Sequence, residues 1–290
     1  MVRAQMQSAS FRRHSATMHA VARCANQLHQ SRMNTQAGRP RWLLAWEMGS
    51  GMGHWAGLTA IASRAIAAGI EVVMVVPNLA PSGLAAPPGA RVIACPPLVV
   101  HGNEAGGTSS MAELLALHGF AHASTLIPIL RAWRDLMTLI APDAVVVDHA
   151  PAALAVAQAL HIPVVQLGTG FAIPPAQAQK LPPFRTWETP DGLAMTRAEI
   201  DLVQSLGHAA RALDLPALPQ SAAAIYRAPA VLRTIPPLDH YRDRPAGALY
   251  CGPLEVAGET SQAPPLWPVL PGGPRRRVVA YLKADDPLAV

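Results

Sequence analysis

The feature that most constrains the fold is a glycine-rich loop between an apolar run and a helical pattern. The run covers residues 42–46, glycines follow at positions 49, 51 and 53, and apolar residues then recur at helical spacing over residues 58–66. A second apolar run at residues 72–76 ends at Pro77. Short, continuous apolar runs are typical of strands buried on both faces of a parallel sheet. The order strand, loop, helix, strand therefore predicts a Rossmann-like α/β fold.

The alternation of strand and helix patterns continues, which predicts a doubly wound parallel sheet. Further strands are expected at residues 91–95, 144–147, 163–167, 230–235 and 248–251. Helices are expected at residues 111–140, 152–160 and 197–213. The first of these is predicted as one long helix or two short ones, interrupted at Pro128. Residues 168–192 are rich in Gly and Pro and predict a long loop of the kind that carries function.

Composition divides the chain into four predicted parts. Residues 1–40 form a basic extension without regular structure, and residues 41–251 form the Rossmann-like domain. Residues 252–275, rich in Pro and Gly, are expected to be a linker. Residues 276–290 begin one more strand and are interpreted as the stub of a truncated second domain.

The net charge of +5 belongs to the amino-terminal extension. Residues 1–40 hold six arginines and no acidic residue, which leaves 17 basic against 18 acidic residues in the rest of the chain. A nucleic-acid-binding domain carries its basic surface on the folded part, so no nucleic-acid partner is expected. The extension also has the composition of an organelle-targeting presequence, but it lacks an amphipathic stripe, and an unstructured extension is preferred.

The three cysteines, at positions 24, 95 and 251, are scattered and form no metal-binding motif. Reduced thiols and a cytoplasmic location follow as the simplest expectation. No apolar run approaches the roughly 18 residues of a membrane span, so no transmembrane segment is expected. His118 and His122 have a spacing that zinc ligands use on a helix, but Gly119 lies between them and no third ligand is apparent, so no metal is predicted.

Two polar residues are expected at the same edge of the sheet. His54 lies where the helix after the glycine loop begins, and Asp148 ends the strand at 144–147. In a doubly wound sheet the strands at 42–46 and 144–147 are neighbours, so their carboxyl ends meet. His54 and Asp148 could then form a base and its orienting carboxylate, or serve the structure only. The spacing leaves both interpretations open.

The glycine loop departs from the dinucleotide-binding fingerprint. That pattern requires glycine at positions 49, 51 and 54, but position 54 is His. The strand at 72–76 is followed by Pro77 and Asn78, whereas the fingerprint has an acidic residue for the ribose. Both departures argue against a nucleotide-dependent oxidoreductase, which is retained as the third alternative.

Three motifs in order resemble the amino-terminal half of UDP-glucuronosyltransferase-like glycosyltransferases of the GT-B fold: WEMGSGMGH at 46–54, VVVDHAP at 145–151 and IPVVQLGTGF at 162–171. The resemblance covers roughly residues 41–283. It implies that His54 is the general base on an acceptor hydroxyl and that Asp148 supports it, with Asp143 in the same strand region as the alternative. The reaction implied is inverting transfer of a hexosyl group from a nucleotide-diphosphate sugar.

The same resemblance implies which domain binds the acceptor and which binds the donor. We expect an apolar small-molecule acceptor at Gly51, Gly53, His149, Gly170 and Phe171. The donor, a UDP-linked sugar acting as co-substrate rather than as cofactor, is held mainly by a second domain in such enzymes. A chain without that domain is expected to be inactive alone and to use a nucleotide sugar only when a donor domain is supplied. The second interpretation is a non-catalytic acceptor-binding or helper protein.

Overall fold

The computed structural model describes residues 38–49, 52–79, 85–101, 107–176, 180–185 and 189–254. The chain divides into two units, Met1–Ala257 and Gly258–Val290, and every described residue belongs to the first. The predicted extension up to residue 37, the predicted linker beyond residue 254 and the predicted segment 276–290 lie outside the described residues.

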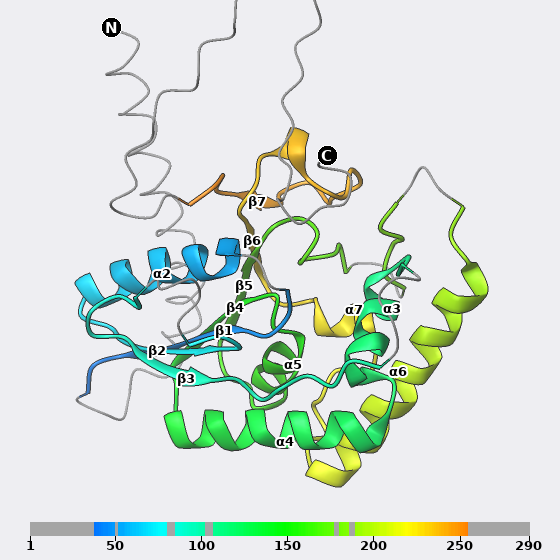
Figure 1. The fold of residues 1–290 in the computed structure, drawn as a ribbon, viewed down its shortest axis with the longest axis horizontal. Helices are drawn as coiled ribbons and strands as arrows, with labels where there is room; N and C mark the ends of the chain where they lie inside the picture. Colours follow the sequence, from blue (N-terminus) through cyan, green and yellow to red (C-terminus); the bar gives the residue numbers. More distant parts are fainter. Residues whose placement is uncertain are drawn as a thin grey trace, which may run out of the picture. The chain divides into compact units, whose positions relative to one another are not determined.

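The described residues contain a 7-stranded, entirely parallel sheet in the order β3-β2-β1-β4-β5-β6-β7 (Figure 1). Its strands are β1 (Arg41–Trp46), β2 (Glu71–Val76), β3 (Arg91–Ala94), β4 (Ala144–Asp148), β5 (Val164–Gly168), β6 (Ala230–Leu232) and β7 (Leu249–Tyr250). The chain starts at β1, winds outward to β3, and returns to β4 on the other side of β1. This is the doubly wound order, so the predicted α/β fold class and the predicted pairing of the first and fourth strands are confirmed.

Helices cover both faces of the sheet (Figure 1). They are α2 (Met52–Ala67), α3 (Met111–Leu115), α4 (Ala123–Ile140), α5 (Pro151–Ala159), α6 (Gly192–Leu213) and α7 (Ala222–Ile225), with a π-helical turn η3 (Ala116–Phe120) and a 3-10 turn η4 (Pro236–Leu238). Helix α2 packs on one face of the sheet, and residues of α3 to α7 pack on the other. The period of two in a strand explains this division: Leu43 and Ala45 of β1 face the larger core, and Leu44 faces α2.

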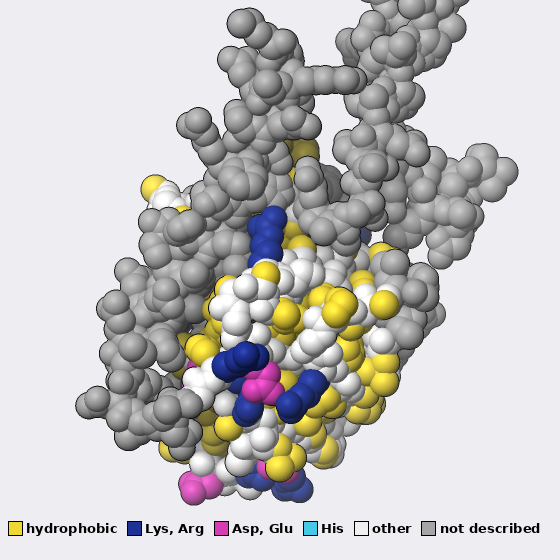
Figure 2. Space-filling view, turned by 90° about the vertical axis from the view of Figure 1, so that its left-hand side faces the viewer, with side chains coloured by type: hydrophobic (Ala, Val, Ile, Leu, Met, Phe, Trp, Pro, Cys, Tyr) yellow, Lys and Arg dark blue, Asp and Glu magenta, His cyan; other side chains and the backbone are white. Residues whose placement is uncertain are grey.

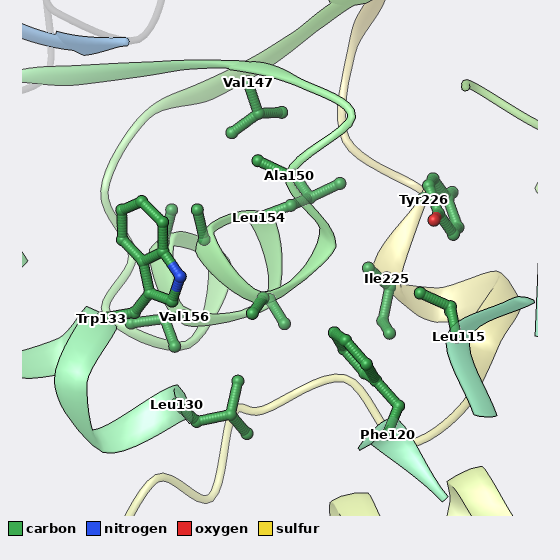
Figure 3. Close-up of a cluster of buried hydrophobic side chains, with 14 of the residues drawn as sticks. Leu115, Phe120, Leu130, Trp133, Val147, Ala150, Leu154, Val156, Ile225 and Tyr226 are labelled. Carbon is green, nitrogen blue, oxygen red and sulfur yellow. The ribbon is translucent and has the colours of Figure 1, made fainter. Parts of the chain in front are cut away.

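The larger core lies between the sheet and helices α4 and α5. Trp133 of α4 is fully buried, and Figure 3 shows its indole beside Val156 of α5. Phe120 and Ile225 lie in the same cluster, although more than a hundred residues separate them in the sequence. This core joins the amino-terminal and carboxyl-terminal parts of the described chain and fixes α5 behind the edge of the sheet where β4 ends.

The predicted break at Pro128 is wrong. Pro128 lies inside the continuous helix α4, and the chain bends earlier, where Gly119 has φ +87° and His118 also leaves helical geometry. Glycine adopts a positive φ without steric cost, whereas a proline in the second turn of a helix removes a single hydrogen bond. Among the described residues no single helix is long and apolar enough to cross a membrane, but Met111–Phe120 and Ala123–Ile140, bent by 84°, meet the length and composition criteria as a pair.

The predicted long loop runs from β5 to α6. Its described residues carry no helix or strand, apart from an isolated bridge between Ser110 and Pro183. Two short elements, α7 and η4, were not predicted, because four or three residues give too little periodicity to detect.

Ion pairs link the amino ends of the first three strands. Glu71, at the start of β2, pairs with Arg41 at 2.8 Å and with Arg91 at 3.0 Å. These three residues begin β2, β1 and β3, so the ion pairs link strands that are neighbours in the sheet. Figure 2 shows basic and acidic side chains side by side on the surface that faces the viewer there, among apolar and uncharged polar ones.

We expect the variant Trp133→Ala to lower the free energy of unfolding by about 3–5 kcal/mol, the usual cost of emptying a large aromatic site in a core. Urea denaturation followed by circular dichroism measures the effect. The matched control is Leu139→Ala on the same helix, where the side chain is 82% exposed and the change should stay within about 0.5 kcal/mol. Equal losses in both variants would contradict the assignment of this core.

Candidate active site

The site lies where β1 and β4 end. The two strands are in parallel register, with Trp46 beside Asp148. Immediately after them, the backbone N–H of Met48 donates to the carbonyl of His149 at 3.0 Å. The loops that follow both strands are therefore tied together. Helix α2 begins a few residues later and carries His54 back over this edge.

The structure places His54 and Asp148 within hydrogen-bond distance, as predicted, and we call these two residues the dyad. Nδ1 of His54 lies 2.9 Å from Oδ1 of Asp148, whose side chain is fully buried, whereas the imidazole is 17% exposed. Because a carboxylate can only accept, Nδ1 carries a proton in this hydrogen bond, and in a neutral imidazole Nε2 then carries the free lone pair. Asp143 is not an alternative partner, because its carboxylate accepts the backbone N–H of Arg41 at the opposite end of β4.

A third residue, Arg233, completes the arrangement and was not predicted. It follows β6, and its Nη2 donates to Oδ2 of Asp148 at 2.6 Å. Its Nη1 donates to the backbone carbonyl of Gly53 at 3.0 Å. The side chain is 9% exposed, so a guanidinium and an imidazole share one buried carboxylate. The sequence signal was present, since a charged residue stood inside a predicted apolar strand at 230–235.

The free nitrogen of His54 lies close to the glycine loop. The imidazole stacks on the indole of Trp46, with ring centroids 5.3 Å apart. Gly49 has φ +84°, and a Cβ added there would lie 2.9 Å from Nε2 of His54. Only glycine therefore fits this position, for two independent reasons: the left-handed backbone and the closeness of the base.

His149 lies beside His54 and is kept neutral. Its ring centroid is 5.8 Å from that of His54, and its backbone has φ +52°. Burial, together with smaller contributions from the neighbouring His54 and His118, lowers the pKa of the His149 imidazole to about 3. Its Nε2 is buried and has no hydrogen-bond partner among the described residues. A neutral ring with a buried, unpaired nitrogen therefore lies beside His54, and such a nitrogen is rare in a folded protein.

A series of aromatic rings continues from the dyad, and we call His54, His149, Phe171, Phe184 and His240 the ring series. The Phe171 centroid is 6.1 Å from His149, 4.8 Å from Phe184 and 5.3 Å from His240. The two phenylalanines belong to the predicted loop, whereas His240 comes from the segment after η4 and was not predicted. Its Nε2 is also buried without a partner among the residues described.

The glycines predicted to contact the acceptor have different surroundings. Gly53 lies in α2, where its carbonyl accepts from Arg233 and an added Cβ would meet nothing within 4 Å. Gly170 packs closely against Asp239, because an added Cβ would lie 2.0 Å from Oδ1 of that residue. Its carbonyl accepts from Nη2 of Arg244 at 2.9 Å. Gly51 lies outside the described residues.

The other histidine pair is not arranged as zinc ligands on one helix. His118 lies in the π-helical turn with its Nδ1 2.9 Å from the carbonyl of Leu114, and His122 is the extended residue that precedes α4. Within the ranges that the structure describes, no group of three or more His, Cys, Asp or Glu side chains is placed to hold a metal ion. A pocket of about 630 Å³ lies apart from the dyad, lined by residues 173–176, 226–230 and 244–249 together with Leu232.

Glu47 connects the loop after β1 to the start of α5. Its carboxylate accepts the backbone N–H groups of Ala152 at 2.9 Å and Ala153 at 3.1 Å, at the start of α5. The capping residue Ala150 has no polar side chain for this task, so Glu47, from the loop after β1, takes the role of a helix cap. Burial raises the pKa of Glu47 to about 8, against the opposing effect of the two N–H groups.

No protein-family model matches the chain, and no curated protein matches it. Solved structures do. They include a UDP-glucosyltransferase from Polygonum tinctorium capable of glucosylating indoxyl, 17% identical over 80% of this chain and 56% of that one, with a TM-score of 0.43. The glycosyltransferase SnogD from Streptomyces nogalater is 17% identical over 73% and 50%, with a TM-score of 0.43. The spinosyn rhamnosyltransferase SpnG is 19% identical over 72% and 49%, with a TM-score of 0.42.

These structures are glycosyltransferases, the class that the sequence motifs resemble. The chain spans about half of their length, between 49% and 56%. Similarity at this level does not assign a function, so the functional proposal rests on the arrangement of the residues in the site.

The variant Glu47→Gln should change how stability depends on pH. A folded-state pKa raised to about 8 means that the folded protein holds this proton after the unfolded chain has lost it near the ordinary value of 4.5. The contribution of Glu47 to the free energy of unfolding is therefore complete below about pH 4.5 and falls as the pH rises toward 8. Glutamine does not titrate, so the difference in unfolding free energy between wild type and variant should decrease across that window. Urea titrations at several pH values measure it, and a constant difference would contradict the burial of an uncharged Glu47.

Proposed function

We propose that this chain is the acceptor-binding half of an inverting, nucleotide-sugar-dependent glycosyltransferase, with His54 as its general base. The observation that carries the proposal is the hydrogen bond of 2.9 Å between His54 Nδ1 and the buried Asp148. It leaves Nε2 as a proton acceptor at the edge of the sheet where doubly wound folds bind their ligands. A neutral base positioned by a carboxylate is the arrangement that deprotonation of a hydroxyl requires.

In the proposed reaction the acceptor hydroxyl donates its hydrogen bond to His54 Nε2. The proton passes to that nitrogen as the oxygen attacks the anomeric carbon of the donor sugar. A new carbon–oxygen bond forms while the bond to the diphosphate breaks, and the nucleoside diphosphate leaves with the electron pair. A single in-line displacement inverts the anomeric centre. Asp148 stabilises the imidazolium that forms and holds the ring in place.

The ring series supports an acceptor that is largely apolar and contains a ring. Phe171, which is half-buried, offers aromatic surface close to the dyad and packs on the buried Phe184, with ring centroids 4.8 Å apart. Two buried imidazole nitrogens, Nε2 of His149 and Nε2 of His240, lack partners among the described residues and can bind polar groups on such a molecule. Apolar lining with a few convergent polar groups is typical of small-molecule sites.

The donor sugar, expected to be UDP-linked, is assigned to a second domain that is not among the described residues. Transfer requires that donor and acceptor be held together, because positioning supplies much of the rate enhancement. We therefore propose that the chain binds acceptors by itself but transfers sugar efficiently only when a donor-binding half is supplied.

The test combines the full chain with the separately produced donor-binding half of a UDP-glucosyltransferase, UDP-glucose and a panel of hydroxylated aromatic acceptors. Product is detected by mass spectrometry. We expect His54→Ala to reduce the rate of product formation by a factor of about 10² to 10⁴, the usual contribution of a general base, while acceptor binding persists.

The matched control is His208→Ala, which removes an exposed imidazole on α6 and should leave the rate unchanged. Full activity in His54→Ala would remove this residue from the mechanism. Acceptor binding without transfer, for every donor half tried, would instead favour the non-catalytic acceptor-binding or helper protein.

We expect the variant Gly49→Ala to abolish transfer in the same assay, because its methyl group would lie 2.9 Å from Nε2 of His54 and cover the base. The control is Gly89→Ala, which carries a similar backbone strain at φ +91° but would contact only Ile66. Strain alone should lower stability equally in both variants, as measured by thermal unfolding. Activity retained in Gly49→Ala would show that the acceptor does not approach His54 from this side.

A further inference from the structure

Three hydrogen bonds hold Arg233 in place. Its guanidinium donates to Oδ2 of Asp148 at 2.6 Å and to the carbonyl of Gly53 at 3.0 Å. Its backbone N–H donates to the carbonyl of Gly168 at 2.7 Å, which continues the pairing of β5 and β6 beyond the last strand residue. Two donors of a planar fork thus meet two fixed acceptors, which a lysine amine cannot reproduce.

Gly57 provides the space for this guanidinium. It lies inside α2, where glycine is unfavourable relative to alanine. A Cβ added at Gly57 would lie 2.6 Å from Nη1 and 2.7 Å from Cζ of Arg233, which is far too close. The helix therefore carries a locally unfavourable residue at a position where a side chain would displace the guanidinium from Asp148.

The charged and titratable groups that face His54 among the described residues are few. Asp148 comes from β4, Arg233 from the segment after β6, and His149, which is neutral, from the loop after β4. Glu47 of the loop after β1 points instead into the start of α5. The charged groups of this hydrogen-bonded arrangement are therefore one carboxylate and one guanidinium.

These two groups act in opposite directions. A buried carboxylate without another cation would hold a proton on the imidazole, because the resulting ion pair compensates its charge. Arg233 already compensates Asp148, so protonation of His54 would add a second positive charge to a site that is neutral as a pair. The carboxylate can still orient the Nδ1–H group, since its other oxygen accepts that hydrogen bond.

We propose that Arg233 is a positioning residue that keeps His54 unprotonated, and so ready to act as a base, by sharing the carboxylate of Asp148. The consequence for catalysis rests on the proposed function of His54. The effect on the proton affinity of His54 does not, and it can be measured on the chain without donor or acceptor.

The experiment follows the imidazole signals of His54 by two-dimensional NMR over a pH titration of the full chain, with His54→Ala used to assign them. In Arg233→Met we expect the midpoint of the His54 titration to rise by at least about one pH unit, the usual effect of removing a positive charge that neutralises the partner carboxylate. Arg233→Lys keeps the charge without the fork and should give a smaller rise than Arg233→Met.

A second variant reaches the same result without changing Arg233. Gly57→Ala displaces the guanidinium, favours the helix, and should also raise the midpoint. Its matched control is Gly207→Ala inside α6, where the added Cβ would be in ordinary contact, 3.7 Å from Arg211 and Gln220, and the midpoint should not move. If Arg233→Met does not fold, Gly57→Ala decides the question.

An unchanged midpoint in folded Arg233→Met or in Gly57→Ala overturns the proposal, whatever the function of the chain. If the proposed function also holds, the acidic limb of the pH–rate profile in the reconstituted assay should move to higher pH by the same amount in both variants. A raised NMR midpoint without any transfer in wild type would support the role of Arg233 and count against the proposed function alone.

Discussion

A carboxylate removed from water must be compensated by charge and hydrogen bonds, and at Asp148 this requirement joins three distant parts of the chain. The residue ends β4, His54 comes from α2 and Arg233 follows β6. All three converge because β4 lies between the strands that precede these segments, β1 and β5–β6. The orientation of His54 is therefore not a property of the glycine loop alone. It depends on the order of the strands and on a buried charge that side chains from two other segments satisfy.

Glu47 shows what happens when a buried carboxylate lacks a cation. It lies one residue beyond β1 and accepts two backbone N–H groups, yet its pKa is raised to about 8 by burial. Helix N–H groups carry only partial charge and do not replace a guanidinium. The two carboxylates therefore have different tasks at the same edge: Glu47 ties the loop after β1 to α5, while Asp148 holds a guanidinium and an imidazole.

The fold and the dyad could be predicted from the sequence because each rests on a local pattern combined with one general rule. Apolar runs gave the strands, the doubly wound order made β1 and β4 neighbours, and residues at their ends then had to meet. Arg233 and His240 were missed because no local pattern says which side chain of a later strand or loop reaches across the sheet. Pro128 was misjudged because its effect depends on its position in the helix, whereas Gly119 supplied the positive φ that the bend required.

The same reasoning separates this site from the dinucleotide sites found on similar sheets. In the fingerprint of such sites the helix start binds a pyrophosphate, and a third glycine lets this helix pack closely on the strand. Here that position is His54, whose ring stacks on Trp46 and points its Nδ1 at Asp148. Its backbone neighbour Gly53 is occupied as well, since its carbonyl accepts from Arg233. The start of α2 therefore holds an imidazole in a fixed orientation, and under the proposed function its Nε2 suits a hydroxyl better than a phosphate.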